Sequence, residues 1–175
     1  NITDLDLRDK TQPDGNDIIF MDGDGVANLL SHEIEYYNST NGLLVAWVNV
    51  PQLTSVEDTL LYMYYGNPGC INQQNPAGVW DTDYVMVQHL KETSGIHADS
   101  TSYNNDGICV NGTNQNAVGI IDGANGFDGT NDWINCGNNE SLDLPDALTL
   151  EAWVKRTGDG TGSYPSIISR ASPAS

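Results

Sequence analysis

The feature that most constrains this chain is a succession of short apolar stretches, each closed by turn residues. No stretch keeps the 3.6-residue period of an amphipathic helix. Runs of about four to eight residues bounded by Gly, Pro, Asn or Asp are typical of β-strands. The stretches with this pattern are 18–21, 43–50, 59–65, 85–90, 107–110, 133–136 and 148–154. Their spacing predicts an all-β fold of antiparallel β-sandwich or jelly-roll modules.

Composition agrees with a folded, turn-rich chain. The 175 residues include 18 Gly and 7 Pro, too many for long helices, whereas 38% of the residues are apolar and four are Trp. That apolar content is sufficient for a packed core. The segment 69–77 is polar and rich in Asn and Gln, as a linker is. We therefore expect one β-sandwich module at 1–68 and a second at 78–175.

The strong acidity of the chain limits its partners. Six Lys and Arg against 24 Asp and Glu give a formal net charge of −18. The six cations are scattered, so the chain lacks the clustered positive charge that binds nucleic acids or anionic membrane surfaces. No apolar run approaches the roughly 18 residues that span a bilayer. We expect neither nucleic acid binding nor a membrane span in this segment.

Asparagine and cysteine residues bear on the compartment. Asn-x-Ser/Thr glycosylation acceptors lie at Asn1, Asn38, Asn111 and Asn139. With the acidity, they favour an extracellular or cell-surface location. Cys109 and Cys136 occupy strand-like stretches of the same half, which favours a disulfide between them and leaves Cys70 free or paired between chains. Three reduced, buried thiols are the alternative.

Motifs in the two halves resemble two known families. Residues 1–68 contain DGNDIIF at 14–20, HEIE at 32–35, LVAWV at 44–48 and YMYYGN at 62–67. These resemble a domain of unknown function that is common in secreted archaeal and bacterial surface proteins. Residues 78–175 contain GVWD at 78–81, QHL at 88–90, FDG at 127–129 and LEAWV at 150–154. These resemble the start of a laminin-G-like domain of the concanavalin A-like lectin/glucanase fold.

Compared with those families, both modules look incomplete at the chain ends. We expect either that the 175 residues belong to a longer chain or that another subunit supplies the missing strands. Unpaired strand edges are costly, and strand addition between subunits is one route by which they are covered. This interpretation predicts partners that are copies of the chain or other surface proteins.

The acidic and histidine residues do not form a complete catalytic pattern. Glu33 and Glu35 share a strand face, as the carboxylates of laminarinase-type glycosidases do, but the third acidic position of that motif is absent. A solvated strand face is the preferred interpretation. His32, His89 and His97 lack a nucleophile motif or zinc spacing. We expect His89 to be a hydrogen-bonded structural residue and His97 to be solvated, so the sequence predicts no catalytic residue and no enzyme.

Calcium is the cofactor that the loops of the second module favour. Carboxylate and amide oxygens on flexible loops are suitable ligands, and the laminin-G-like resemblance implies calcium at a loop rim. The candidate ligands are Asp99, Asn104, Asp106, Asp128 and Asp132. The alternative is that these residues serve only tight turns.

Aromatic side chains indicate where a glycan would bind. Tyr103 and Tyr164 lie in or near loops and are candidates for a glycan-binding platform, whereas the four Trp residues lie in strand patterns and are expected in the core.

The sequence as a whole predicts a non-catalytic extracellular structural or adhesive protein, a cell-surface or self-assembling fibre subunit completed by strands of neighbouring subunits. The alternative is a calcium-assisted carbohydrate-binding module, either independent or accessory to a glycan-degrading enzyme.

Overall fold

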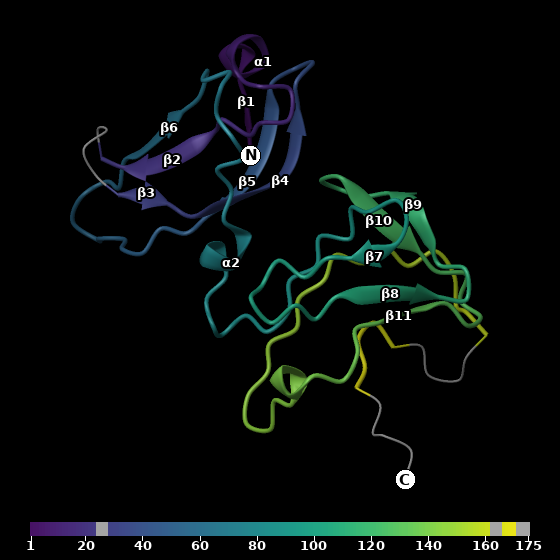
Figure 1. The fold of residues 1–175 in the computed structure, drawn as a ribbon. Coiled ribbons are helices and arrows are strands. Elements are labelled where there is room, and N and C mark those ends of the chain that lie inside the picture. The colour runs from purple at the N-terminus through teal and green to yellow at the C-terminus, as the bar shows by residue number, and fades with distance from the viewer. Residues whose placement is uncertain (24–27, 162–165, 171–175) are drawn as a thin grey trace.

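The computed structural model describes residues 1–23, 28–161 and 166–170 of the chain. Figure 1 shows an all-β molecule, as predicted, with its strands in two groups. Among the described residues every strand pair is antiparallel, and the strands form four small sheets. The first group precedes the short helix α2 (Pro76–Val79) and the second follows it. None of the helices in the described residues is long and apolar enough to cross a membrane.

Two three-stranded sheets make up the N-terminal unit. One has the order β1-β5-β4, with β1 at Ile2–Thr3, β5 at Leu43–Val48 and β4 at His32–Asn38. The other has the order β3-β2-β6, with β3 at Leu29–Leu30, β2 at Ile19–Asp22 and β6 at Leu61–Tyr64. The apolar core joins both sheets and contains Leu7, Ile18, Ile34 and Leu44, with Phe20, Tyr37, Ala46, Met63 and Tyr65 packed against them. This unit is a β-sandwich.

Helix α1 (Leu5–Lys10) was not expected from the sequence. Its single buried residue, Leu7, is fully enclosed in the sandwich core, and the Tyr37 hydroxyl donates to the Leu7 carbonyl (2.9 Å). The Asp4 carboxylate caps the helix by accepting from the Asp6 backbone N–H at 2.7 Å. A helix of six residues is too short to establish a 3.6-residue period, so its tertiary contacts hold it in place.

Strand β4 buries four consecutive residues, His32 to Glu35. Ile34 belongs to the sandwich core, and the His32 ring packs on Phe20 with ring centroids 5.3 Å apart. The pairing with β5 is irregular between Ile34 and Tyr36, so Glu35 has no residue opposite it. A bulge of this kind redirects a side chain and bends the strand. Glu33 and Glu35 are therefore enclosed from the side of the second unit, contrary to the solvated face expected from the sequence.

The C-terminal unit contains two smaller sheets. One has the order β11-β8-β7, with β11 at Trp133–Asn135, β8 at Gly107–Val110 and β7 at Ile96–His97. The other pairs β9 (Asn114–Val118) with β10 (Gly123–Gly126). A 3-10 turn, η1, follows at Glu140–Leu142.

Two expected strands are absent from the described structure, and both corrections have a physical reason. At 85–90 only an isolated bridge between Gln88 and Asp99 forms. Leu90 has a φ of 55°, which ends extended backbone there. The stretch 148–154 has strand-like alternation but no partner strand among the described residues.

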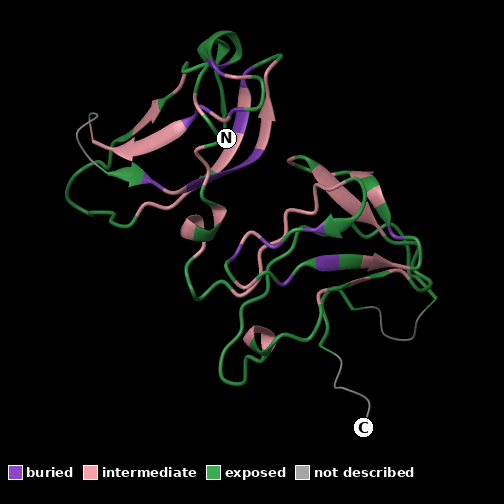
Figure 2. Cartoon of the chain, in the orientation of Figure 1, coloured by how far each residue is buried: buried purple, intermediate pink, exposed green. Residues whose placement is uncertain are grey.

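The interior of the C-terminal unit is polar. Its buried side chains are His97, Asp99, Thr101, Asn105 and Thr113, whereas the buried apolar residues of the described chain all precede position 45. Figure 2 shows this contrast, with purple positions along β4 and β5 and mostly green positions from β11 onward. Trp133 and Trp153 are exposed, and so is Trp47 of the N-terminal unit, so the expectation that these Trp residues belong to the core is wrong. In this unit hydrogen bonds replace much of the apolar packing.

Candidate functional site at the junction of the two units

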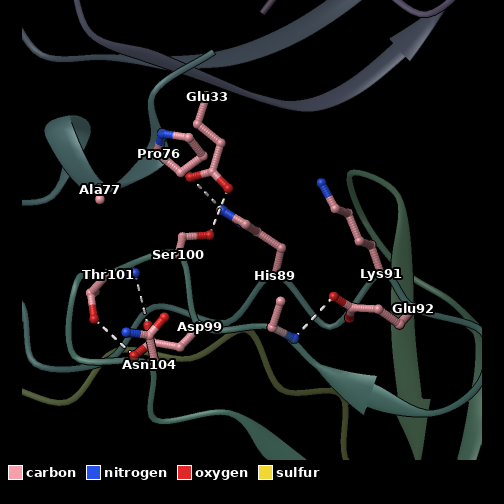
Figure 3. Close-up of a pocket in the computed structure, with 11 residues that line it drawn as sticks. Glu33, Pro76, Ala77, His89, Lys91, Glu92, Asp99, Ser100, Thr101 and Asn104 are labelled. Atoms are coloured by element: carbon pink, nitrogen blue, oxygen red, sulfur yellow. Dashed lines mark hydrogen bonds and ion pairs between the residues drawn. The ribbon is translucent and has the colours of Figure 1, made fainter. Parts of the chain in front are cut away.

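A buried carboxylate, Glu33, joins the N-terminal sandwich to the C-terminal unit (Figure 3). Only 5% of the residue is exposed. Its Oε1 accepts a hydrogen bond from Ser100 Oγ at 2.6 Å, and its Oε2 accepts one from Trp80 Nε1 at 2.9 Å. The Nε2 atom of His89 lies 3.2 Å from Oε2, an ion-pair distance that lacks hydrogen-bond alignment. All three partners follow the predicted linker in the sequence.

Glu35 contacts the other side of the same imidazole. Its Oε1 lies 3.4 Å from His89 Nδ1, and its Oε2 accepts from Trp47 Nε1 at 2.7 Å. The rings of Trp47 and His89 stack with centroids 6.4 Å apart, and Trp47 and Trp80 are 5.2 Å apart. His89 is thus placed between two carboxylates and two indoles. We name these five residues and Ser100 the junction cluster.

The junction cluster sets the ionisation of Glu33. Burial by itself raises the pKa of this carboxyl, but the His89 imidazole and the hydrogen bonds from Ser100 and Trp80 outweigh burial and lower the pKa to about 2. Glu33 is therefore ionised at neutral pH. A buried carboxylate of this kind needs all its partners, because an uncompensated charge in a low-dielectric interior is costly.

A cavity of about 360 Å³ lies beside the junction cluster, lined by Glu33, Pro76, Ala77, His89, Lys91, Glu92, Ala98, Asp99, Ser100, Thr101 and Asn104. Several of its polar groups bond to each other, as Ser100 does to Glu33 and Thr101 to Asp99, and others bond to residues outside the lining, as Glu92 does to His97. Ser100 Oγ donates to Glu33 and not to His89, so these residues do not form a nucleophile and base pair in the described structure. Lys91 Nζ reaches the Ile34 carbonyl at 3.4 Å, which adds a further contact between the units.

The first group of calcium candidates serves the loop that follows the β7 strand. Asp99 accepts four protein hydrogen bonds, from the N–H groups of Val87, Thr101 and Asn105 and from Thr101 Oγ1, at 2.8–3.0 Å. Asp106 accepts from the Asp99 N–H at 2.9 Å. Asn104 is exposed and has a φ of 54°. These bonds organise the loop, and the proposed role of these residues in calcium binding stays a prediction.

The second group, Asp128 and Asp132, lies in the loop between β10 and β11. Asp132 Oδ2 accepts from the Asp128 N–H at 3.0 Å, and Asp128 Oδ1 accepts from the Thr130 N–H at 2.7 Å. Asp132 Oδ1 is buried and has no hydrogen-bond partner. Within the described residues no group of three or more His, Cys, Asp and Glu side chains is arranged to hold a metal ion.

All three thiols are free in the structure, so the Cys109–Cys136 bond expected from the sequence is absent. The register explains why, since Cys109 pairs across the sheet with Ile134 and Cys136 lies two positions further along. Cys136 Sγ instead lies 3.6 Å from Gln88 Nε2. Burial raises the pKa of both thiols.

Among the other candidates, Asn1, Asn111 and Asn139 are exposed, and Asn38 is half-buried. Asn38 and Asn139 also accept hydrogen bonds from residues two positions on, in local turns. Tyr103 is half-buried and donates to the Thr82 carbonyl at 3.1 Å. Tyr164 lies outside the described residues.

Sequence reasoning missed the junction cluster as a unit. His89 was expected to be a hydrogen-bonded structural residue, but its contacts are at ion-pair distance from Glu33 and Glu35, which lie more than forty positions away in the sequence. His97, expected to be solvated, is fully buried. The local signals for this cluster were the carboxylate pair Glu33 and Glu35 on one strand, and Trp80 and His89 in polar stretches of the sequence.

The two groups of antiparallel strands make the chain an all-β protein. The contacts of Glu33 and Glu35 with His89 connect its two units. The chain belongs to the DUF2341 family, described as a domain of unknown function, whose family model matches residues 14–136. The match includes every member of the junction cluster and crosses the segment 69–77. No curated protein and no solved structure matches the chain.

Proposed function

We propose that this chain is a non-catalytic structural module of an extracellular or cell-surface protein, and that its C-terminal unit is completed by pairing with a second copy. The observation that carries the proposal is the exposed, strand-like stretch 148–154. Trp153 is 90% exposed, and Leu148, Leu150 and Val154 are each more than half exposed. An apolar surface of this size usually marks an interaction site.

The polar interior of the C-terminal unit supports the same proposal. Its apolar side chains face outward while polar side chains fill the centre. A shallow pocket lined by Leu150, Glu151, Ala152, Val154, Ile167 and Ile168 lies along this stretch. A strand from another chain would cover these apolar groups and pair the unpaired backbone.

The sequence of the stretch suits pairing with a copy of itself. Antiparallel pairing centred on Trp153 places Glu151 of each copy opposite Lys155 of the other, and the two Trp153 rings face each other. Opposite charges and aromatic rings at facing positions each stabilise a strand pair by about 0.2–1 kcal/mol. A chain of net charge −18 otherwise repels its copies, so local charge complementarity is needed at the contact.

The surface location and the absence of catalysis rest on other features. Acidity, scattered cations and four glycosylation acceptors favour an extracellular setting. The likeness of residues 78–175 to the start of a laminin-G-like domain supports an adhesive or structural role for the C-terminal unit. In the junction cluster, both Glu33 oxygens are occupied by protein donors, which favours a structural role for the carboxylates.

The test is the oligomeric state of the chain, measured by light scattering after size-exclusion chromatography and by electron microscopy. We expect dimers or longer assemblies that Glu151→Lys or Lys155→Glu weakens and the double charge reversal restores. Val56→Asp, at an exposed apolar residue of the N-terminal unit, is the matched control and should leave assembly unchanged. A monomer at all concentrations, or a double reversal as weak as the singles, would refute pairing through this stretch.

One observation favours the second candidate, a calcium-assisted carbohydrate-binding module. The Asp132 Oδ1 atom is a buried acceptor without a donor, and a bound cation would satisfy it. Calorimetric titration with calcium should show binding that Asp132→Asn removes and that Asp106→Asn, in the other loop, retains. Binding of glycans only in the presence of calcium would favour this candidate over the structural module.

A further inference from the structure

A second cluster, in the C-terminal unit, contains a half-buried thiol, a buried imidazole and a half-buried carboxylate in hydrogen-bonded order. His97 is fully buried, and its Nδ1 lies 2.8 Å from Glu92 Oε2. On the other side of the ring, Nε2 lies 3.3 Å from Cys109 Sγ. A carboxylate that holds one ring nitrogen leaves the other free to act as a base toward a nucleophile.

Two carboxamides contact the same His97 nitrogen. Gln115 Nε2 lies 3.1 Å from His97 Nε2, and Asn125 Nδ2 lies 2.8 Å from it. With the Nδ1 proton directed at Glu92, Nε2 offers a single lone pair. The Cys109 S–H and both amide groups then compete for one acceptor.

The turn between β8 and β9 brings the thiol and the Gln115 amide together. Asn111 and Gly112 have φ values of 59° and 95°, so the chain reverses within two residues. Thr113 Oγ1 fixes the turn by donating to the Val110 carbonyl at 3.0 Å. Gln115 Nε2 also donates to the Gly95 carbonyl at 3.0 Å, which holds the amide in place beside His97.

We propose that Cys109 and Gln115 form an intramolecular thioester, with His97 as the proton carrier and Glu92 as its positioning residue. Cys109 Sγ attacks the Gln115 side-chain carbonyl carbon, and His97 Nε2 takes the thiol proton. The same nitrogen then gives that proton to the amide nitrogen as the carbon–nitrogen bond breaks. The products are a sulfur–carbon bond and one molecule of ammonia, so the step needs no oxidant or reductant.

The surroundings suit this step. Thiol and amide lie on successive strands joined by one short turn and contact one base, so no second molecule has to be oriented. Because burial raises the pKa of the Cys109 thiol, the group is protonated at neutral pH and attack depends on the base. The enclosure of His97 limits the water that would hydrolyse the product. The thioester would acylate a primary amine, so the ligand class is an amine such as a lysine side chain.

The test is the intact mass of the freshly purified chain together with the number of free thiols in denaturant. We expect a mass lower than that of the sequence by one ammonia, and two titratable thiols instead of three. Methylamine should add to the protein and restore the third thiol. Cys109→Ser should abolish the mass deficit, whereas Cys70→Ser should retain it, and His97→Gln should reduce the fraction modified.

Other outcomes overturn the proposal. A full sequence mass with three free thiols would exclude the thioester. A mass deficit with three free thiols would assign the lost ammonia to a succinimide at an Asn-Gly step. A deficit in both mass and thiols that survives Gln115→Ala would exclude Gln115 as the acyl donor and point to Asn125.

Discussion

At the scale of single residues, β4 has four buried side chains in succession, and its two faces differ in polarity. His32 faces the apolar core with neither ring nitrogen hydrogen-bonded, whereas Glu33 faces a set of donors. Alternation along a strand sends neighbouring side chains to opposite faces. Burial disfavours the charged form on both faces, so the His32 imidazole is neutral, whereas the hydrogen bonds and the His89 imidazole outweigh burial at Glu33 and keep that carboxylate ionised.

Glu33→Gln is predicted to destabilise the chain by about 3 kcal/mol, because it leaves His89 and two hydrogen-bond donors without their buried charge. Equilibrium unfolding in denaturant, followed by Trp fluorescence, measures the change. Glu57→Gln, at an exposed glutamate, should change the free energy of unfolding by less than about 0.5 kcal/mol. Equal effects of the two substitutions would contradict the role of the junction cluster.

Lowering the pH should remove the stabilisation that ionised Glu33 gives the folded chain. The pKa of Glu33 is about 2 in the folded chain against an ordinary value of 4.5. The unfolded chain therefore binds the proton first as pH falls, so stability decreases from pH 4.5 toward pH 2. Unfolding measured across this range should show a smaller decrease in Glu33→Gln than in the parent chain. Parallel pH profiles would be incompatible with a depressed pKa at Glu33.

His32 contributes to the pH dependence of stability in a higher pH range than Glu33. Burial lowers the pKa of His32 below its ordinary value of 6.5, so protonation favours the unfolded chain. Stability should decrease as pH falls below 6.5, and His32→Leu should remove that part of the pH dependence. Thermal unfolding between pH 5 and pH 7.5 tests this, and an unchanged slope in the variant would rule it out.

At the scale of elements, tight approaches of the backbone hold short strands and helices in place. Gly42, in the turn before β5, has a φ of 70°, and a Cβ there would lie 1.8 Å from the Asp4 carbonyl oxygen. The Asp4 N–H also donates to the Gly42 carbonyl at 3.1 Å, so this turn secures β1 and the start of α1. A side chain at this position must displace the N-terminal segment.

Gly42→Ala is accordingly predicted to destabilise the chain by more than about 2 kcal/mol, from a steric clash and left-handed strain together. The matched control is Gly158→Ala, because a Cβ at Gly158 meets nothing within 4 Å and its φ is ordinary. Chemical denaturation measures both variants. The explanation fails if Gly42→Ala is as stable as the control.

At the scale of the whole molecule, the junction cluster connects two groups of strands, one with an apolar interior and one with a polar interior. The N-terminal sandwich has an apolar core, whereas the C-terminal unit depends on polar contacts and on the junction. Hydrogen bonds from Asn49 to the Gly78 carbonyl (2.9 Å) and from the Ile34 N–H to Gln74 Oε1 (2.6 Å) add to the connection. We expect the C-terminal unit to be the less stable part when separated from the sandwich.

The parent chain should therefore unfold in one transition, and Trp80→Ala should split it into two. The substitution removes a hydrogen bond to Glu33 and the aromatic contacts with Trp47 and Tyr84. Hydrogen exchange should show loss of protection in β7, β8 and β11 before the sandwich opens. Phe127→Ala, at an exposed aromatic residue of the C-terminal unit, is the control and should leave a single transition.

Five of the seven stretches that the local sequence patterns predicted as strands are strands in the described structure, but the patterns did not predict how deeply they are buried. The stretches at 18–21, 43–50, 59–65, 107–110 and 133–136 correspond to β2, β5, β6, β8 and β11. Alternation at 148–154 predicted a strand that lacks a partner in the described chain, because a strand exists only where another pairs with it. Strand β9 was missed because its residues, mostly Asn, Gln and Ala, have low strand propensity.

By itself the sequence determined the all-β class, the positions of five of the described strands and the acidic character of the chain, since periodicity, turn residues and charge are local properties. Only the tertiary structure decided which side chains meet. Glu33 and His89, or His97 and Gln115, come together through the packing of separate sheets, and no spacing along the chain encodes that approach. The residues expected to be solvated, Glu33, Glu35 and His97, are buried by contacts that only the folded chain creates.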